Sequence, residues 1–207
     1  MKVLLINGSP NPDGCTNRAL REVENTLREE GLETRIFQIG NRPVRGCNGC
    51  NACEKLGRCV HEDDAANEML RLMTEADGIV VGTPVYYSGA NGALCALLDR
   101  IFYAGGSRLT GKPAAAVVSA RRSGTTAAYQ RLNQYFAIKQ MPIVTSQYWN
   151  NVHGYTPGDV EQDLEGLQTM RTLGKNMAWM LKLIQSGQSA GLPFPEGEKL
   201  IYTDFIR

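Results

Sequence analysis

Short apolar runs alternate with amphipathic segments along the chain, and this alternation restricts the fold more than any other feature of the sequence. The expected strands cover residues 2–7, 33–39, 78–82, 114–119 and 142–148. The expected helices cover 16–30, 65–75, 91–102, 125–139 and 159–185, with Thr16 as the N-cap of the first. Continuous apolar strands are typical of sheets covered on both faces. Five strands alternating with helices predict an α/β fold, a three-layer sandwich with a five-stranded parallel sheet.

The chain shows no internal repeat, no low-complexity segment and no boundary of a second domain. Its 207 residues predict one domain over 1–186, followed by a Gly- and Pro-containing C-terminal tail, or an arm that packs on a neighbouring subunit, over 187–207. Ligands of parallel sheets bind outside the carboxyl ends of the strands, near the point where the strand order reverses. The segments that follow the first, third and fourth strands are therefore the candidate ligand-binding segments.

The charge balance restricts the partners. Lys and Arg total 22 against 21 for Asp and Glu, a net charge of +1, which gives no electrostatic reason to expect nucleic acid or an anionic membrane as a partner. No apolar run approaches the roughly 20 residues that span a bilayer. The first strand begins directly after Met1, which leaves no room for a signal peptide. We expect a cytoplasmic protein.

Residues 8–17 (GSPNPDGCTN) join the first strand to the first helix. Glycines and prolines in this tight loop leave backbone N–H groups exposed at a helix N-terminus, where the helix dipole favours an anion. Ser9, Thr16 and Asn17 can donate further hydrogen bonds to phosphate oxygens. The loop has neither GxGxxG nor the lysine of a GxxxxGK[ST] loop, which suits a phosphomonoester held by neutral donors. A plain strand-to-helix turn is the alternative.

Two further loops belong to the candidate site. Residues 83–91 leave the third strand, and their proline and two tyrosines can lie along a planar ring, although simple rim packing is the alternative. Residues 119–125 follow the fourth strand, where small side chains permit close approach of a ligand. Arg121 and Arg122 offer positive charge to an anionic ligand, or form a solvated pair beside a turn.

Residues 3–16, 77–87 and 94–100 together resemble the flavodoxin-like NAD(P)H-dependent FMN reductase family. The resemblance implies a flavodoxin-like fold and makes 1–186 an FMN-binding domain, with the phosphate at 8–17 and the isoalloxazine beside the loop after the third strand. The chain departs from the family at Cys15, where relatives often carry Asn or Ser. The FMN-binding residues expected on this basis are Ser9, Pro10, Thr16, Asn17, Pro84, Val85, Tyr86, Tyr87, Ser119, Arg121 and Gly124.

Four cysteines, Cys47, Cys50, Cys53 and Cys59, lie within thirteen residues. In a reducing cytosol such a group indicates metal binding or redox chemistry rather than a disulfide framework. Four close thiolates can surround an iron–sulfur cluster, with glycines easing the turns. Zinc, a redox-active dithiol and plain reduced thiols are the alternatives.

The spacing of these cysteines resembles the compact motif of iron–sulfur flavoproteins, a branch of the same family. The resemblance implies that all four are ligands of a [4Fe-4S] cluster. It also implies a homodimer or homotetramer in which the cluster of one subunit lies near the flavin of another.

We therefore expect an FMN-dependent oxidoreductase that takes electrons from NAD(P)H or a ferredoxin-type donor and relays them through the [4Fe-4S] cluster. The flavin carries such chemistry, so no catalytic side chain is required. His61 is expected at the surface or near a helix N-terminus rather than at a metal. His153, in the segment after the fifth strand, is a candidate to approach the flavin of its own or a neighbouring subunit. A non-catalytic flavodoxin-type electron carrier and a zinc-stapled interaction module are the alternative functions.

Overall fold

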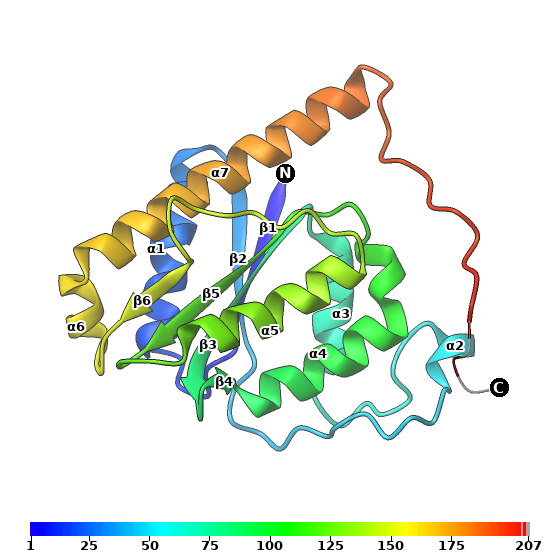
Figure 1. Cartoon of the computed structure of the whole chain (residues 1–207), viewed down its shortest axis with the longest axis horizontal. Helices are drawn as coiled ribbons and strands as arrows, with labels where there is room; N and C mark the ends of the chain where they lie inside the picture. The colour runs from blue at the N-terminus through cyan, green and yellow to red at the C-terminus, as the bar shows by residue number, and fades with distance from the viewer. Residues whose placement is uncertain (204, 206–207) are drawn as a thin grey trace.

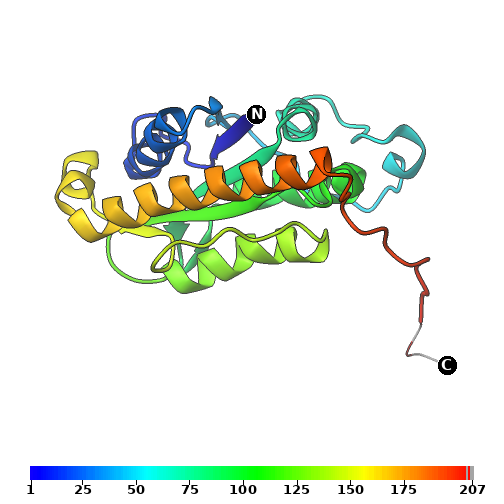
Figure 2. The same cartoon turned by 90° about the horizontal axis from the view of Figure 1, so that it is seen from above.

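The computed structural model describes residues 1–203 and 205 of the chain. The strands are β1 (Lys2–Asn7), β2 (Glu33–Gln38), β3 (Gly78–Tyr86), β4 (Gly89–Ala90), β5 (Ala114–Ala120) and β6 (Asn151–His153). The helices are α1 (Cys15–Glu29), α2 (Cys53–Leu56), α3 (Ala66–Glu75), α4 (Gly92–Gly105), α5 (Thr125–Ile138), α6 (Pro157–Gln162) and α7 (Leu164–Ser189), with a short 3-10 turn at Gly106–Leu109. Figure 1 shows the sheet between two layers of helices, and Figure 2 shows the same layers from above.

The sheet confirms the predicted parallel arrangement. Five parallel strands follow the order β2-β1-β3-β5-β6, while β4 pairs only with β3, antiparallel to it. Since β1 has β2 on one side and β3 on the other, the strand order reverses at β1. The carboxyl ends of β1 and β3 therefore form the edge at which a doubly wound sheet binds its ligands.

Alternate side chains of the strands enter two separate apolar layers, as the two-residue repeat of a strand requires. On one face, Leu4 and Ile6 of β1 pack with buried residues of α3, α4 and α5. On the other face, Val3 and Leu5 pack against α1 and α7. All four side chains are at most 1% exposed. This double coverage explains why the strands are almost continuously apolar.

The predicted fifth strand is displaced along the chain. Within 142–148, only Ile143 forms a bridge to β5, and the paired strand is β6 at Asn151–His153. The polar residues between them leave the sheet and bind α7, where the Ser146 hydroxyl donates to the Thr169 carbonyl at 2.7 Å. The apolar start of the predicted strand thus touches the sheet, whereas its polar second half is satisfied by a helix.

The helix predictions need two corrections. Gly14, not Thr16, is the N-cap of α1, and Thr16 lies buried in the first turn. The predicted last helix is two helices, because the chain bends at Asp163, whose carboxylate accepts the Gly166 N–H at 2.9 Å and caps α7. The four-residue α2 within the cysteine-rich loop is an element that the sequence reasoning missed.

Helix α7 continues to Ser189, beyond the predicted domain boundary at 186, and residues 192–203 form no helix or strand. Residues 204, 206 and 207 of the predicted tail lie outside the described residues. The division into a domain and an arm stays a prediction. In the described part of the chain, no helix combines the length and apolarity that a membrane span requires.

Candidate functional site

A cavity of about 270 Å³ opens at the carboxyl edge of the sheet, where the loops after β1, β5 and β6 meet the end of β3. Its position is the one that the strand order predicts. The lining residues are Ser9, Asn11, Gly14, Cys15, Thr16, Pro84, Val85, Tyr86, Ser119, Ala120, Arg121, Gly154, Tyr155 and Pro157.

The loop after β1 is held in shape by its own short side chains. The buried Asn7 carboxamide accepts the Ser9 N–H, the Ser9 hydroxyl accepts the Asn11 N–H, and the Asn11 side chain accepts the Asp13 N–H, each at 3.1 Å. The Gln38 side chain donates to the Ser9 carbonyl at 2.6 Å and ties the loop to the end of β2. These bonds fix the loop before any ligand arrives, which lowers the entropic cost of binding.

Helix α1 points its N-terminus at this cavity. Its N-cap is Gly14, and among the described residues no side chain caps the helix, so its first N–H groups remain available to a ligand. Cys15 and Thr16 of this first turn line the cavity. The hydroxyls of Thr16 and Ser119 share a hydrogen bond of 2.7 Å, which joins the first loop to the loop after β5. The arrangement favours an anion held by neutral donors.

A strained hairpin forms the side of the cavity beside β3. Tyr87 and Ser88 connect β3 to β4 with φ values of 48° and 63°, a left-handed conformation that costs residues other than glycine roughly 1 kcal/mol or more each. Gly124, at φ 93°, packs against this turn, because a Cβ there would lie 2.8 Å from the Ser88 Cα. The side chain of Asn91, which follows β4, donates to the Gly8 carbonyl at 2.7 Å and so connects the hairpin to the loop after β1. Packing therefore holds the strained turn in place.

The structure brings seven of the eleven predicted ligand residues to the cavity: Ser9, Thr16, Pro84, Val85, Tyr86, Ser119 and Arg121. The other four do not line it: Pro10, Asn17, Tyr87 and Gly124. The Tyr87 side chain is fully exposed beside the site, and Gly124 acts through the hairpin.

Sequence reasoning missed the loop after β6. Gly154, Tyr155 and Pro157 line the cavity, but only the segments after the first, third and fourth strands were expected to bind a ligand. The Gly-Tyr-Thr-Pro-Gly run at 154–158 is a turn signal that marks the end of an element and could have found this loop. His153 ends β6, lies next to the lining residue Gly154 and is more than one-third exposed.

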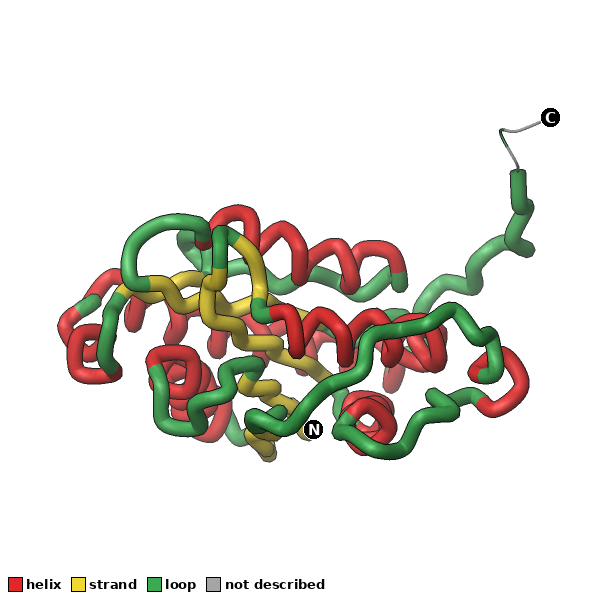
Figure 3. Tube along the Cα trace, turned by 90° about the horizontal axis from the view of Figure 1, so that it is seen from below, coloured by secondary structure: helices red, strands yellow, loops and turns green. Residues whose placement is uncertain are grey.

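The four clustered cysteines line a second, smaller hollow beside the C-terminal part of α4, together with His61, Arg100 and Tyr103. Figure 3 shows the long loop that leads from β2 to α2. Cys47 and Cys50 precede α2, Cys53 begins it and Cys59 follows it. Cys47 and Cys50 are exposed, Cys53 and Cys59 are half-buried, and all four are free thiols. Gly49 and Gly57 take positive φ values of 67° and 64°, which lets the loop turn sharply around the hollow.

The donor set of this hollow fits an iron–sulfur cluster, since four thiolates are the ligands that such clusters take. Burial raises the pKa of the Cys53 thiol, and the neighbouring Cys50 and Cys47 add to the shift. In the part of the chain that the structure describes, no three His, Cys, Asp or Glu side chains are grouped closely enough to hold a single metal ion. The thiols are instead spread around one hollow.

Arg100 of α4 is a further residue at this hollow that sequence reasoning did not assign. Its side chain is 1% exposed and pairs with Asp64, whose side chain is 4% exposed. Burial would raise the pKa of the Asp64 carboxyl, but the hydrogen bond from Arg100 and the N–H groups of Ala66 and Arg45 outweigh burial and lower it. The feature of the sequence that could have identified this residue is a lone arginine shortly after the apolar stretch 94–98.

The strand order and the cavity at its switch point define a flavodoxin-like protein with a site for a phosphate-bearing cofactor. The chain belongs to the NADPH-dependent FMN reductase family, whose sequence model matches residues 1–156. Its relatives place it in the iron–sulfur flavoprotein branch of that family. It is accordingly an FMN-dependent oxidoreductase.

The chain is 38% identical over 195 residues to an iron–sulfur flavoprotein of Methanocaldococcus jannaschii, covering 89% of this chain and 100% of the relative. It is 31% identical to the iron–sulfur flavoprotein of Methanosarcina thermophila, covering 91% of this chain and 99% of the relative. Among solved structures, RosB with a bound 8-demethyl-8-formylriboflavin-5'-phosphate intermediate is similar with a TM-score of 0.71 at 15% identity, over 100% of this chain and 92% of RosB. That last likeness concerns the fold alone.

Proposed function

We propose that this oxidoreductase takes electrons from NAD(P)H or a ferredoxin-type donor and relays them through a [4Fe-4S] cluster on Cys47, Cys50, Cys53 and Cys59. The observation that carries the proposal is the gathering of these four free thiols around one hollow, in a chain whose sheet edge offers a separate cofactor cavity. Close relatives named iron–sulfur flavoproteins support it.

The residues of the cavity have distinct tasks toward FMN. The first turn of α1, with Ser9 and Thr16, would hold the phosphate through neutral donors and the helix dipole. The carboxyl end of β3, from Pro84 to Tyr86, would lie along the isoalloxazine, and Ser119 and Arg121 would approach its edge. Pro10, Asn17, Tyr87 and Gly124 would support these contacts from outside the cavity. Bound FMN supplies the capacity to store two electrons and release them singly.

In Figure 1, β4 and the end of β3 lie near one end of α4, and the loop with α2 lies near the other. The cavity is lined at the first of these ends and the cysteine hollow at the second. Asn91, the N-cap of α4, donates a hydrogen bond to Gly8 in the loop after β1, whereas Arg100 donates one to Cys59. The nine residues of α4 from Gly92 to Arg100 rise by about 1.5 Å each, so this stretch of the helix is roughly 14 Å long. This separation supports the proposal of a homodimer or homotetramer in which the cysteine hollow of one subunit faces the cavity of another. A hydrodynamic mass equal to that of one chain would count against it.

The test of the proposed reaction is anaerobic reduction of the purified protein by NADH, NADPH or reduced ferredoxin, followed by flavin absorbance. We expect one of these donors to bleach the flavin, and steady turnover when a flavin or quinone acceptor is added. Reduction without turnover would instead indicate an electron carrier. A flavin that none of the donors bleaches would contradict the proposal.

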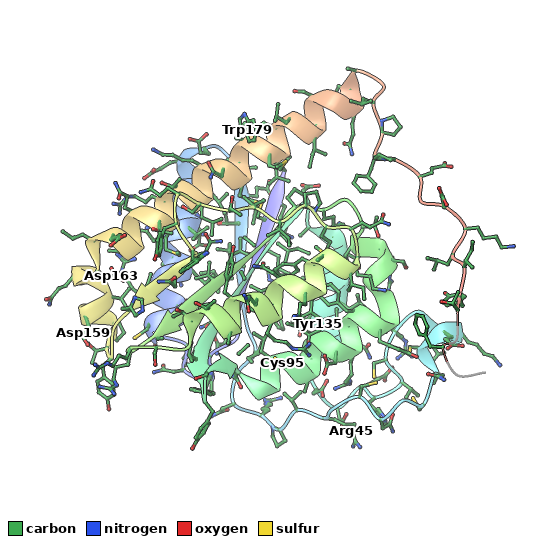
Figure 4. All side chains as sticks on the ribbon, in the orientation of Figure 1. Arg45, Cys95, Tyr135, Asp159, Asp163 and Trp179 are labelled. Atoms are coloured by element: carbon green, nitrogen blue, oxygen red, sulfur yellow. The ribbon has the colours of Figure 1, made fainter. Side chains whose placement is uncertain are left out.

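Cys15 offers a direct test of where FMN binds. Burial raises the pKa of the Cys15 thiol above its ordinary 9.0, so the thiol is neutral near pH 7 and its alkylation accelerates as the pH rises through that pKa. Because Cys15 lines the cavity, FMN at about ten times its Kd should slow alkylation roughly tenfold in peptide mapping. Cys95 on α4, labelled in Figure 4, is the matched control, since burial also raises its pKa but it does not line the cavity. Equal protection of both thiols, or of neither, would contradict the placement.

The even charge balance and the family membership further support a cytoplasmic protein that exchanges electrons with small-molecule or protein donors. Nucleic acid and membranes are not proposed as partners.

A further inference from the structure

Arg100 is a buried cation whose hydrogen bonds converge on the cysteine-rich loop. Its Nε–H donates to the Cys59 Sγ at 3.2 Å, and its terminal nitrogens donate to the carbonyls of Arg45 and His61, also at 3.2 Å. It also donates to the Asp64 carboxylate. Arg45, labelled in Figure 4, lies at the start of the loop, so one guanidinium on α4 connects both sides of the hollow.

The planar fork of an arginine suits this task, because it donates in several fixed directions at once and stays charged. A buried ion pair is a weak source of stability, since the cost of removing two charges from water offsets much of their attraction. The Arg100–Asp64 pair therefore calls for an explanation other than stability. The direction of its Nε–H toward a proposed cluster ligand supplies one.

A second observation at the hollow concerns His61. His61 lines it, and its Nε2 is buried without a hydrogen-bond partner in the described residues. Buried polar atoms in native structures normally have partners. The unpartnered Nε2 therefore indicates that this hollow takes an occupant, and the four thiols around it favour one that contains sulfur.

We propose that Arg100 is the positioning residue of the cysteine hollow, acting through Cys59; the inference rests on the proposed cluster. Its guanidinium fixes the loop from Arg45 to His61 on α4, and its Nε–H holds the Cys59 sulfur. Hydrogen bonds to the ligand sulfurs and nearby positive charge stabilise the reduced, more negative state of an iron–sulfur cluster. Arg100 therefore makes the reduction potential of the cluster more positive than the thiolates alone would set it.

Two variants separate these roles. Arg100→Met/Asp64→Leu removes both buried charges, so that no carboxylate is left buried without a partner. Asp64→Asn keeps the bond from Arg100 to Cys59 but removes the countercharge. The matched control is Arg71→Gln/Glu75→Gln, which removes an exposed ion pair on α3. Arg100→Lys is the substitute if the double variant does not fold, since lysine keeps the charge but not the fork.

The first measurement is hydrogen exchange of the metal-free chain. Amides at 45–61 should exchange several-fold faster than in the wild type both in Arg100→Met/Asp64→Leu and in Arg100→Lys, which keeps Asp64 and its bonds to the Arg45 and Ala66 N–H groups. They should exchange at the wild-type rate in the Arg71 control. Unchanged exchange would overturn the anchoring role. This measurement needs no cluster, so it decides on Arg100 even if the wild type fails to take up iron and the proposed function falls.

The second measurement is a redox titration of the reconstituted cluster, followed by absorbance and electron paramagnetic resonance. The midpoint potential should become more negative in Arg100→Met/Asp64→Leu, and should be unchanged or more positive in Asp64→Asn. A negative shift confined to Arg100→Met/Asp64→Leu distinguishes the bond to Cys59 from simple loosening of the loop, which would shift the potential of both variants alike. Loss of the cluster from the Arg100 variant alone, with FMN retained, also supports the proposal. A retained cluster at the wild-type potential would overturn it.

Discussion

Cys50→Ser is expected to abolish the proposed iron–sulfur cluster and to leave FMN in place. The cluster needs four thiolates, and the serine hydroxyl is a poor substitute for one of them. Cys50 is exposed, so its replacement should change the free energy of unfolding by less than about 0.5 kcal/mol. The cofactor cavity shares no lining residue with the cysteine hollow, which is why FMN should stay bound.

Iron, acid-labile sulfide and flavin measured in the same variant sample check this prediction. Cys95→Ser is the control, because Cys95 is a half-buried cysteine of α4 that lines neither the cavity nor the hollow. If the Cys50 variant kept the full iron content, Cys50 would not be a ligand. If it lost flavin together with iron, the two sites would not be independent.

Gly8→Ala is expected to weaken FMN binding by roughly tenfold to a hundredfold, about 1.4 to 3 kcal/mol. A Cβ at Gly8 would lie 2.6 Å from the Gly82 carbonyl oxygen, the same oxygen that accepts the Gly8 N–H at 2.8 Å. Because β1 and β3 are paired up to this point, the backbone has no room to move aside. The strain therefore distorts the loop that starts at Gly8, which is the proposed phosphate site.

Flavin fluorescence during titration of the apoprotein with FMN measures this affinity. Gly92→Ala is the matched control: Gly92 begins α4 close to the same loop, and a Cβ there would meet nothing within 4 Å. Wild-type affinity in the Gly8 variant would show that the loop tolerates the displacement. An equal loss in both variants would point to a general effect of replacing glycine.

The sequence was sufficient for the fold wherever local pattern and packing agree. The strands before Gly8 and Gly82 are continuous apolar runs buried on both faces, and the structure contains them. The prediction of a strand over 142–148 was wrong beyond Ile143, because it followed from local pattern alone. The hydroxyl of Ser146 found its partner on α7, a tertiary contact that no local pattern reveals.

The site was predictable to the extent that its residues lie at the carboxyl ends of strands or directly after them. Ser9, Pro84 and Ser119 were expected from their positions, and they do line the cavity. Tyr155 was not expected, because its place depends on where the last strand ends. Arg100 was not expected either, since its partners Asp64 and Cys59 are 36 and 41 residues away in sequence.

The most direct test of the central claim is one cofactor analysis of the anaerobically purified wild-type protein, with its absorbance spectrum, iron, acid-labile sulfide and FMN measured in the same sample. The proposal of a flavin and a cluster in one chain predicts about four irons and about four sulfides per FMN. Flavin without iron would contradict the cluster and leave an FMN reductase with free thiols. Absence of both cofactors would contradict the account as a whole.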